Sequence, residues 1–333
     1  MKFLNQLLRP LSRTLRVASI LLAVTFAGLC QAQAYPERPI SLLIGFPPGG
    51  AFDSVMRTLA EELSKSLGQR VTIDNKAGAG GALATQAVAA APADGYTLLA
   101  AGLQLGTGPH LNKVNYNPLT DLTMIGQVTS VPVMLLVRSD STIKDAKDIL
   151  ALAKKNTNGI TVGSGGVGTT GHFGALMLSN ALGVPVVHVP FKGGAPGLQA
   201  LVGGEIDMMF DQPSGVMQGL LSGGKIRALS VIQEQRSSSL PDVKSAPEIG
   251  LNMEKPLRGW HGIAVRTGTP PAVLQKLNVA LTAAVNSTAF KTKVDQLGLD
   301  LIAGSTPDTF QKYYLAEYDR WGQFIKKHKI TSE

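Results

Sequence analysis

Short apolar segments alternate with amphipathic helical segments along most of the chain, and this alternation restricts the fold more than any other sequence feature. Residues 40–44 are apolar except for one serine, as expected of a buried strand. Leucines recur every four residues between positions 59 and 67, which places them on one face of a helix. Residues 71–73 are the next strand candidate, so this part of the chain predicts one β-α-β unit.

The same pattern recurs further along the chain, where apolar strand candidates are joined by helical or glycine-rich segments. These candidates lie at residues 96–99, 133–137, 160–162, 186–189, 206–210 and 226–231. Strands that alternate with helices pair mainly in parallel, because each helix returns the chain to the same edge of the sheet. The sequence therefore predicts an α/β protein with mainly parallel sheets.

Two segments are predicted to connect separate lobes. Residues 131–137 would enter a second lobe, and residues 260–265 would return to the first. A chain of this length exceeds the size that a single core usually organises. We therefore expect a two-lobed fold with a hinge of two crossing strands. Lobe 1 would be discontinuous, comprising residues 35–135 and 251–333, and lobe 2 would comprise residues 136–250.

The first 34 residues have the three parts of a secretory signal. Four cations and no acid accompany an apolar stretch at residues 17–29, and residues 32–34 form an Ala-Gln-Ala cleavage site. This apolar stretch is shorter than the roughly 20 residues that span a bilayer. We therefore predict a signal peptide at residues 1–34, cleavage before Tyr35 and a periplasmic location, rather than a membrane anchor.

Cysteine content and charge exclude several classes of protein. Cys30 is the only cysteine and lies in the predicted signal, where Leu29 precedes it in place of the small residue that lipidation requires, so neither a disulfide nor a lipid anchor is expected. Without the signal, 27 Lys and Arg face 23 Asp and Glu. This balance is too mild to indicate a nucleic-acid partner, but it suits a small anionic ligand.

A glycine-rich loop at residues 46–53, Phe-Pro-Pro-Gly-Gly-Ala-Phe-Asp, lies between the first predicted strand and its helix. The free N–H groups and the dipole of a helix N-terminus both favour negative charge. Glycines also let a carboxylate approach the backbone closely. The loop is therefore a candidate anion site. Asp53 has two open roles, because it can stabilise the first turn of the helix or bind a ligand group.

A second glycine-rich loop at residues 163–172 follows another predicted strand. Its hydroxyl groups, from Ser164, Thr169 and Thr170, can donate hydrogen bonds to a carboxylate without adding charge. If the two loops belong to different lobes, closure would bring two helix N-termini to one anion. The alternative is that each loop only caps its helix.

Two further loops, at residues 191–196 and 211–214, follow predicted strands of the second lobe. Open α/β sheets bind ligands at the carboxyl ends of their strands, so both loops are candidate site elements. Lys192 is equally consistent with solvent exposure and with ligand contact. Asp211 can bind a ligand or can accept hydrogen bonds from its own loop.

Enzymatic alternatives find little support. The glycines at 166, 168 and 171 match a dinucleotide-binding fingerprint, but residues 172–204 contain no acid of the kind that recognises the ribose. The five histidines have no close metal-ligand spacing. His172 could act as a base for Ser164, yet no acid in the local sequence would orient it. We predict no enzyme, no cofactor and no metal.

A series of motifs runs through the chain after the predicted signal. They are Tyr35-Pro-Glu-Arg-Pro-Ile40, the loop at 46–53, Leu67-Gly-Gln-Arg-Val71, Asn75-Lys-Ala-Gly-Ala-Gly-Gly81, Ala93-Asp-Gly-Tyr-Thr-Leu-Leu99, the loop at 163–172, Val189-Pro-Phe-Lys-Gly-Gly194, and Trp260 with Gly268-Thr-Pro270. Together they resemble the Bug family, also called TctC-like, which comprises the substrate-binding proteins of tripartite tricarboxylate transporters. The resemblance covers essentially the whole chain after the signal.

This resemblance implies a periplasmic binding protein fold, type II-like, that binds a small carboxylate between its lobes and delivers it to membrane transporter subunits. It also implies the ligand-binding residues, which would be Phe46, Pro48, Gly49, Gly50, Ala51, Asp53, Ser164, Gly168, Thr169, Thr170 and Asp211. A monomer is expected, because closure requires free lobes. Other classes left open are a ligand-binding sensor for a signalling partner and a periplasmic enzyme acting on a small acid.

The segment at residues 103–108, Leu-Gln-Leu-Gly-Thr-Gly, is an individual version of a pocket-facing loop of this family. Such variable loops select the part of the solute beyond its shared carboxylate. The sequence therefore predicts a carboxylate ligand without identifying the molecule.

Overall fold

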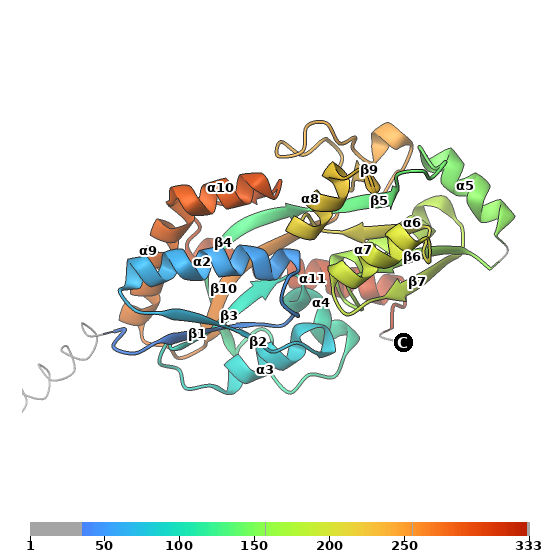
Figure 1. The fold of residues 1–333 in the computed structure, drawn as a ribbon. Helices are drawn as coiled ribbons and strands as arrows, with labels where there is room; N and C mark the ends of the chain where they lie inside the picture. The colour runs from blue at the N-terminus through green and yellow to red at the C-terminus, as the bar shows by residue number, and fades with distance from the viewer. Residues whose placement is uncertain (1–34, 157, 255, 332–333) are drawn as a thin grey trace, which may run out of the picture.

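The computed structural model describes residues 35–331 except residues 157 and 255, and Figure 1 shows their arrangement. The predicted signal peptide lies outside these described residues. None of the helices described there is both long and apolar enough to cross a membrane. The described chain forms two α/β lobes, each built on its own sheet.

Lobe 1 is built on a six-stranded mixed sheet with the order β11-β4-β10-β3-β1-β2. Its strands are β1 (Ile40–Ile44), β2 (Val71–Asn75), β3 (Thr97–Gly102), β4 (Leu122–Pro132), β10 (Arg258–Arg266) and β11 (Asp300–Leu301). Strand β1 pairs in parallel with β2 and β3, whereas β10 runs antiparallel to both β3 and β4. The parallel part of this sheet thus comes from the predicted β-α-β unit and the strand that follows it.

Lobe 2 is built on a five-stranded sheet with the order β7-β6-β8-β5-β9. Its strands are β5 (Met134–Arg138), β6 (Ile160–Ser164), β7 (Val186–Pro190), β8 (Met208–Asp211) and β9 (Ile226–Val231). Strand β6 is parallel to β7 and β8, and β5 is antiparallel to β8 and β9. Both sheets are therefore mixed, and the prediction of mainly parallel sheets is wrong, because the strands next to the passages between lobes form antiparallel pairs.

Helices flank both sheets (Figure 1). Those of lobe 1 are α2 (Ala51–Leu67), α3 (Ala82–Ala90), α4 (Gln104–Leu111), α9 (Pro271–Asn286), α10 (Thr288–Gln296) and α11 (Pro307–Lys327). Those between the strands of lobe 2 are α5 (Ala146–Lys155), α6 (Thr170–Leu182), α7 (Gly194–Gly203) and α8 (Gly215–Ser222). Two short 3-10 turns, η1 (Ala79–Gly81) and η2 (Pro247–Ile249), lie in connecting segments.

The chain passes between the lobes twice, and the two passages lie side by side. Only Val133 separates β4 of the first sheet from β5 of the second, as predicted for the outward passage. Its carbonyl accepts a hydrogen bond of 2.9 Å from Ile232 N–H, and the Ile232 carbonyl accepts one of 2.9 Å from Leu257 N–H. The return passage therefore ends before β10. Residues 260–265, predicted to make this passage, lie inside the first sheet.

The C-terminal helix α11 ties the two lobes together on another side. Its first half packs on the lobe 1 sheet, where Phe310 meets Trp260 of β10 with ring centroids 5.5 Å apart. Its second half reaches Phe173 of α6 in lobe 2, whose ring centroid lies 4.5 Å from that of Trp321. These rings are buried, so the helix contributes to the core of both lobes.

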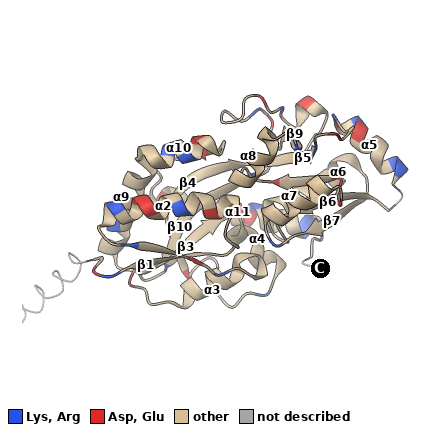
Figure 2. Cartoon of the chain, in the orientation of Figure 1, with Lys and Arg blue, Asp and Glu red and all other residues tan. Residues whose placement is uncertain are grey.

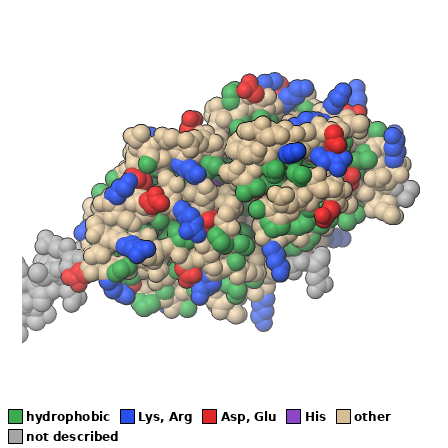
Figure 3. Space-filling view, viewed as in Figure 1, with side chains coloured by type: hydrophobic (Ala, Val, Ile, Leu, Met, Phe, Trp, Pro, Cys, Tyr) green, Lys and Arg blue, Asp and Glu red, His purple; other side chains and the backbone are tan. Residues whose placement is uncertain are grey.

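Charged residues of both signs share the helices α2, α5 and α10 (Figure 2). The face seen in Figure 3 likewise mixes Lys and Arg with Asp and Glu among apolar and other polar side chains. On this face the charges do not separate into a basic and an acidic region, in keeping with the mild net charge of the sequence.

Candidate functional site

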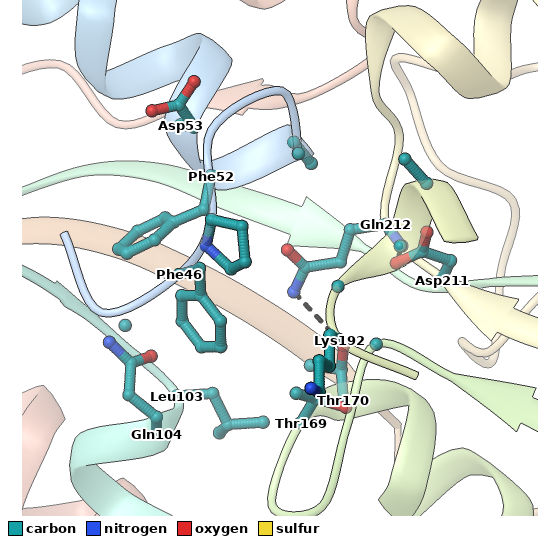
Figure 4. A pocket seen from close by; sticks show the side chains of 18 of the residues that line it. Phe46, Phe52, Asp53, Leu103, Gln104, Thr169, Thr170, Lys192, Asp211 and Gln212 are labelled. Carbon is teal, nitrogen blue, oxygen red and sulfur yellow. Dashed lines mark hydrogen bonds between the residues drawn. The ribbon is translucent and has the colours of Figure 1, made fainter. Parts of the chain in front are cut away.

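A cavity of about 120 Å³ lies between the two lobes, and both lobes line it (Figure 4). Lobe 1 contributes Phe46, Pro47, Pro48, Gly50, Ala51, Phe52, Asp53, Gly102, Leu103, Gln104, Trp260 and His261. Lobe 2 contributes Gly165, Thr169, Thr170, Lys192, Gly193, Gly194, Ala195, Pro196, Asp211 and Gln212. A small solute bound here would therefore contact both lobes.

Most of the predicted site residues line this cavity. They are Phe46, Pro48, Gly50, Ala51, Asp53, Thr169, Thr170 and Asp211. The structure brings them together because the two glycine-rich loops follow strands of different sheets and face each other across the gap between the lobes. The remaining three predicted residues, Gly49, Ser164 and Gly168, are absent from the described lining.

Those three residues support the loops from behind. The Gly49 N–H donates to Asp53 Oδ2 at 2.9 Å. Ser164 is fully buried, with its Oγ 2.6 Å from His188 Nε2. The Gly168 N–H donates to His172 Nδ1 at 3.2 Å, and its carbonyl accepts from the Thr107 hydroxyl of lobe 1 at 2.9 Å. Membership of a glycine-rich loop thus does not place every residue at the cavity.

Four helices begin at the cavity wall, and none of them is capped by a side chain within the described part of the chain. Their N-cap residues are Gly50 for α2, Leu103 for α4, Thr169 for α6 and Gly193 for α7. The N-cap side chains of α5, α8, α10 and α11, which are absent from the described lining, accept hydrogen bonds from the first turn, whereas α3 and α9 are uncapped like the four at the cavity. The helix starts at the cavity thus keep their N–H groups for another acceptor.

Asp53 is bound to its own neighbours. It is 2% exposed, and it accepts hydrogen bonds from Arg57 Nε at 2.8 Å, Gly49 N–H at 2.9 Å and Asn75 Nδ2 at 2.9 Å. Burial alone would raise the pKa of Asp53, but these hydrogen bonds outweigh it and hold the pKa below its usual range. In Figure 4 its carboxylate points away from the other labelled side chains. This geometry favours the role of anchoring the loop over that of binding a ligand.

Asp211 ends β8 and has no ion-pair partner among the described residues. Its Oδ1 accepts a hydrogen bond of 2.9 Å from the Gln212 N–H. Burial raises the pKa of Asp211 to about 7, and this hydrogen bond opposes the rise only partly. Gly194 is required beside it, because a Cβ there would lie 2.2 Å from Asp211 Oδ2. Near neutral pH this carboxyl group can therefore act as a donor or as an acceptor.

Several lining residues had no ligand-binding role assigned from the sequence, and for Lys192 the sequence left that role open. Lys192 is exposed and supplies the one Lys or Arg of the described lining. Gln212 donates from Nε2 to Thr170 Oγ1 at 3.3 Å and packs against Gly259 of β10. Strand β10 also supplies Trp260 and His261, which were assigned to a passage between lobes. The position of Lys192 and Gln212 after strands was the one available signal for them.

The described residues contain no group of three or more His, Cys, Asp or Glu side chains that could hold a metal ion. The cavity instead offers helix N–H groups, hydroxyls, amides and one lysine around an apolar wall. Two mixed α/β sheets, two adjacent passages between them and a cavity at their interface define a two-lobed periplasmic binding protein fold. The site suits a small solute with at least one acceptor group.

Residues 55–330 match the family described as the tripartite tricarboxylate transporter family receptor, TctC. The chain belongs to this family, as its motifs predicted. It is a family of binding proteins rather than of enzymes.

Solved structures agree with this assignment. The chain is 34% identical to periplasmic binding protein BugD, with a TM-score of 0.82 over 89% of this chain and 99% of that one. It is 32% identical to MatC from Rhodopseudomonas palustris, solved with bound malate, with a TM-score of 0.81 over 87% and 100% of the two chains. A further R. palustris protein, solved with adipate, is 29% identical, with a TM-score of 0.83 over 89% and 99%.

Proposed function

We propose that this chain is an exported receptor that captures a small carboxylate in the cavity between its lobes and delivers it to the membrane subunits of a tripartite tricarboxylate-type transporter. The observation that carries the proposal is the set of four uncapped helix starts at the cavity. Two come from each lobe, so one anion can be held by donors from both. Binding would thereby stabilise the closed arrangement of the lobes.

Backbone N–H groups are suited to this task because they bind an anion without the desolvation cost of a buried cation. Lys192 is exposed, so its charge contributes mainly long-range attraction. Arg57 is engaged by Asp53 and is absent from the described lining. The Thr169 hydroxyl donates to the Gly166 carbonyl at 2.7 Å, which leaves Thr170 as the stronger candidate for a hydroxyl donor to the ligand.

The named ligands of the relatives support the chemical class. Malate and adipate are small carboxylates, and the proteins that carry them share about 30% of their residues with this chain. Export is supported by the predicted signal peptide at residues 1–34 and by the family, whose relatives include a periplasmic binding protein. Periplasmic capture followed by transfer to a membrane transporter is the function that combines these features.

The proposal is tested by measuring ligand binding and turnover together. Purified protein lacking residues 1–34 is screened against mono-, di- and tricarboxylates by thermal unfolding, with uncharged amides and alcohols as controls. A binding acid at one hundred times its Kd should stabilise the fold by about 2.7 kcal/mol. Mass spectrometry should recover that acid unchanged. Stabilisation by uncharged compounds alone, or chemical conversion of the acid, would refute the receptor function.

A further inference from the structure

One polar side chain of the cavity wall belongs to neither glycine-rich loop. Gln104 is the first residue of α4, is 8% exposed and lines the cavity. Its amide has no hydrogen-bond partner among the residues that the structure describes. Neither polar atom of this amide is among the fully buried unpaired atoms of the described chain, so both are open to the cavity, where a ligand or an ordered water is expected to complete their hydrogen bonding.

Two glycines make room for this amide. A Cβ at Gly102, the last residue of β3, would lie 2.6 Å from Gln104 Oε1. A Cβ at Gly81 would lie 3.0 Å from Gln104 Cγ. The side chain therefore lies in a recess formed by two separate segments of lobe 1, and larger residues at either position would displace it.

A second uncharged group lies in the same wall. His261 pairs with Gly102 across β10 and β3, is 2% exposed and lines the cavity. Its ring centroid is 4.6 Å from that of Phe52, and its Nδ1 lies 2.9 Å from Thr129 Oγ1. Its Nε2 is buried without a hydrogen-bond partner in the described chain. Burial lowers the pKa of His261 to about 3, so the ring is neutral near pH 7.

The surroundings of Gln104 carry no unpaired charge from lobe 1. Its neighbours in the lining are the apolar Phe46, Phe52 and Leu103, and the single charged residue that lobe 1 gives to the described lining, Asp53, is bound by Arg57. The unpaired charged groups of the lining, Lys192 and Asp211, both come from lobe 2. Lobe 1 thus offers the solute a neutral, partly apolar recess with hydrogen-bonding groups.

We propose that Gln104 is the specificity-determining residue of this receptor, an inference that rests on the proposed function. Gln104 would select acids that also bear an uncharged hydrogen-bonding group, such as an amide, a carbonyl or a hydroxyl. A carboxamide on the solute can satisfy both the donor and the acceptor of the Gln104 side chain. A second carboxylate would leave Gln104 Oε1 without a donor and would lose its water without gaining a cation. A methyl group would leave both atoms of the amide unpaired.

The test compares acids of equal length that differ only at the far end. Isothermal titration calorimetry would use succinamate, succinate and butyrate, then glutaramate, glutarate and pentanoate, then adipamate, adipate and hexanoate. At the length that fits best, the amide acid should bind about tenfold more tightly than the methyl-ended and dicarboxylic acids, as expected for one satisfied buried hydrogen-bonding group.

Gln104→Leu should abolish the preference for the amide over the methyl group while leaving the affinity for the methyl-ended acid near that of the wild type. If Gln104→Leu unfolds at a lower temperature than the wild type, Gln104→Met replaces it in this test, because the methionine side chain is more flexible. Gln233→Leu is the matched control. It removes a glutamine amide whose Nε2 is buried and unpartnered in the described chain. Gln233 lies outside the described lining, so this variant should leave the preference intact.

Two results would refute the proposed role of Gln104 without refuting the proposed receptor function. They are equal or tighter binding of the dicarboxylic acid by the wild type at every length, and an amide preference that survives in Gln104→Leu. Failure of every acid to bind would instead refute the proposed carboxylate receptor, and the inference with it.

Discussion

The two glycine-rich loops that face each other across the cavity are built alike but are held by different chemistry. The lobe 1 loop at residues 46–53 is fixed by a carboxylate, because Asp53 accepts from Gly49, Arg57 and Asn75. The lobe 2 loop at residues 163–172 is fixed by uncharged groups, chiefly the hydroxyl of Ser164 and the imidazoles of His172 and His188. The proposed anion site is therefore supported by an ion pair on one side and by neutral hydrogen bonds on the other.

This difference predicts that the two loops respond to different perturbations. The loop held by the ion pair should depend on one acid, whereas the loop held by histidines should depend on pH. Both should lose ligand affinity when their support fails, since the helix N–H groups would no longer converge.

The largest effect is expected from Asp53→Ala. The substitution removes the acceptor of the Gly49 N–H, one of the two acceptors of Asn75 Nδ2 and the ion-pair partner of Arg57. We expect the free energy of unfolding to fall by about 2–3 kcal/mol and ligand affinity to fall with it. Urea unfolding and calorimetry would measure the two changes.

Asp94→Ala is the matched control for Asp53→Ala, because Asp94 forms an exposed ion pair with Arg38 and neither residue is in the described lining. Such pairs contribute about 0–1 kcal/mol, so stability should change little and affinity not at all. Equal losses in the two variants would show that Asp53 has no special role in the loop.

The lobe 2 loop should weaken as the pH falls. Burial, together with the nearby His188, lowers the pKa of His172 to about 4. Between about pH 6.5 and pH 4, His172 is therefore mostly protonated in the unfolded chain and mostly neutral in the folded protein. The stabilising contribution of the neutral ring is complete above pH 6.5 and is lost progressively towards pH 4, by roughly 2 kcal/mol at pH 5.

His172→Gln should reduce this dependence of stability on pH between 7 and 5, as measured by urea unfolding at the two pH values. The glutamine cannot take up a proton in this range. If the variant and the wild type lost the same stability over this interval, protonation of His172 would not be what weakens the loop.

A smaller effect is expected at the ligand. Thr170 is buried beside the cavity, and its hydroxyl accepts from Gln212 while keeping its own proton for a further acceptor. Thr170→Val should weaken binding of the carboxylate by roughly 1–2 kcal/mol with little change in stability. Thr170→Ser, which retains the hydroxyl, should bind almost as the wild type does. Equal weakening in both variants would assign the effect to packing instead.

The local parts of this site were predictable from sequence, because a strand, a glycine-rich turn and a helix follow one another directly in the chain. Residues 46–53 and 163–172 could be recognised as helix starts for that reason. The direction in which each residue faces was harder to predict. Ser164 and Gly168 belong to the right loop but support it from behind, since the turn directs Thr170 to the cavity instead.

The parts assembled from distant segments could not be predicted. Strand β4 went unrecognised because its sequence, Leu122 to Pro132, mixes polar and apolar residues without a clear alternation. The recess of Gln104 depends on Gly102 and on the pairing of β3 with β10, which brings His261 beside them. No local sequence pattern predicts such a pairing. From the sequence, Gln104 was only one residue of a variable loop, and its proposed role in selecting the ligand rests on the three-dimensional structure.

Helix N–H groups from both lobes are proposed to bind one carboxylate. Backbone amide NMR of the labelled protein, titrated with a binding acid, tests this arrangement most directly. The largest shifts should fall on Ala51 and Phe52 of lobe 1 together with Thr170 and Gly194 of lobe 2, and they should saturate together. Shifts confined to one lobe, or centred away from these helix starts, would contradict it.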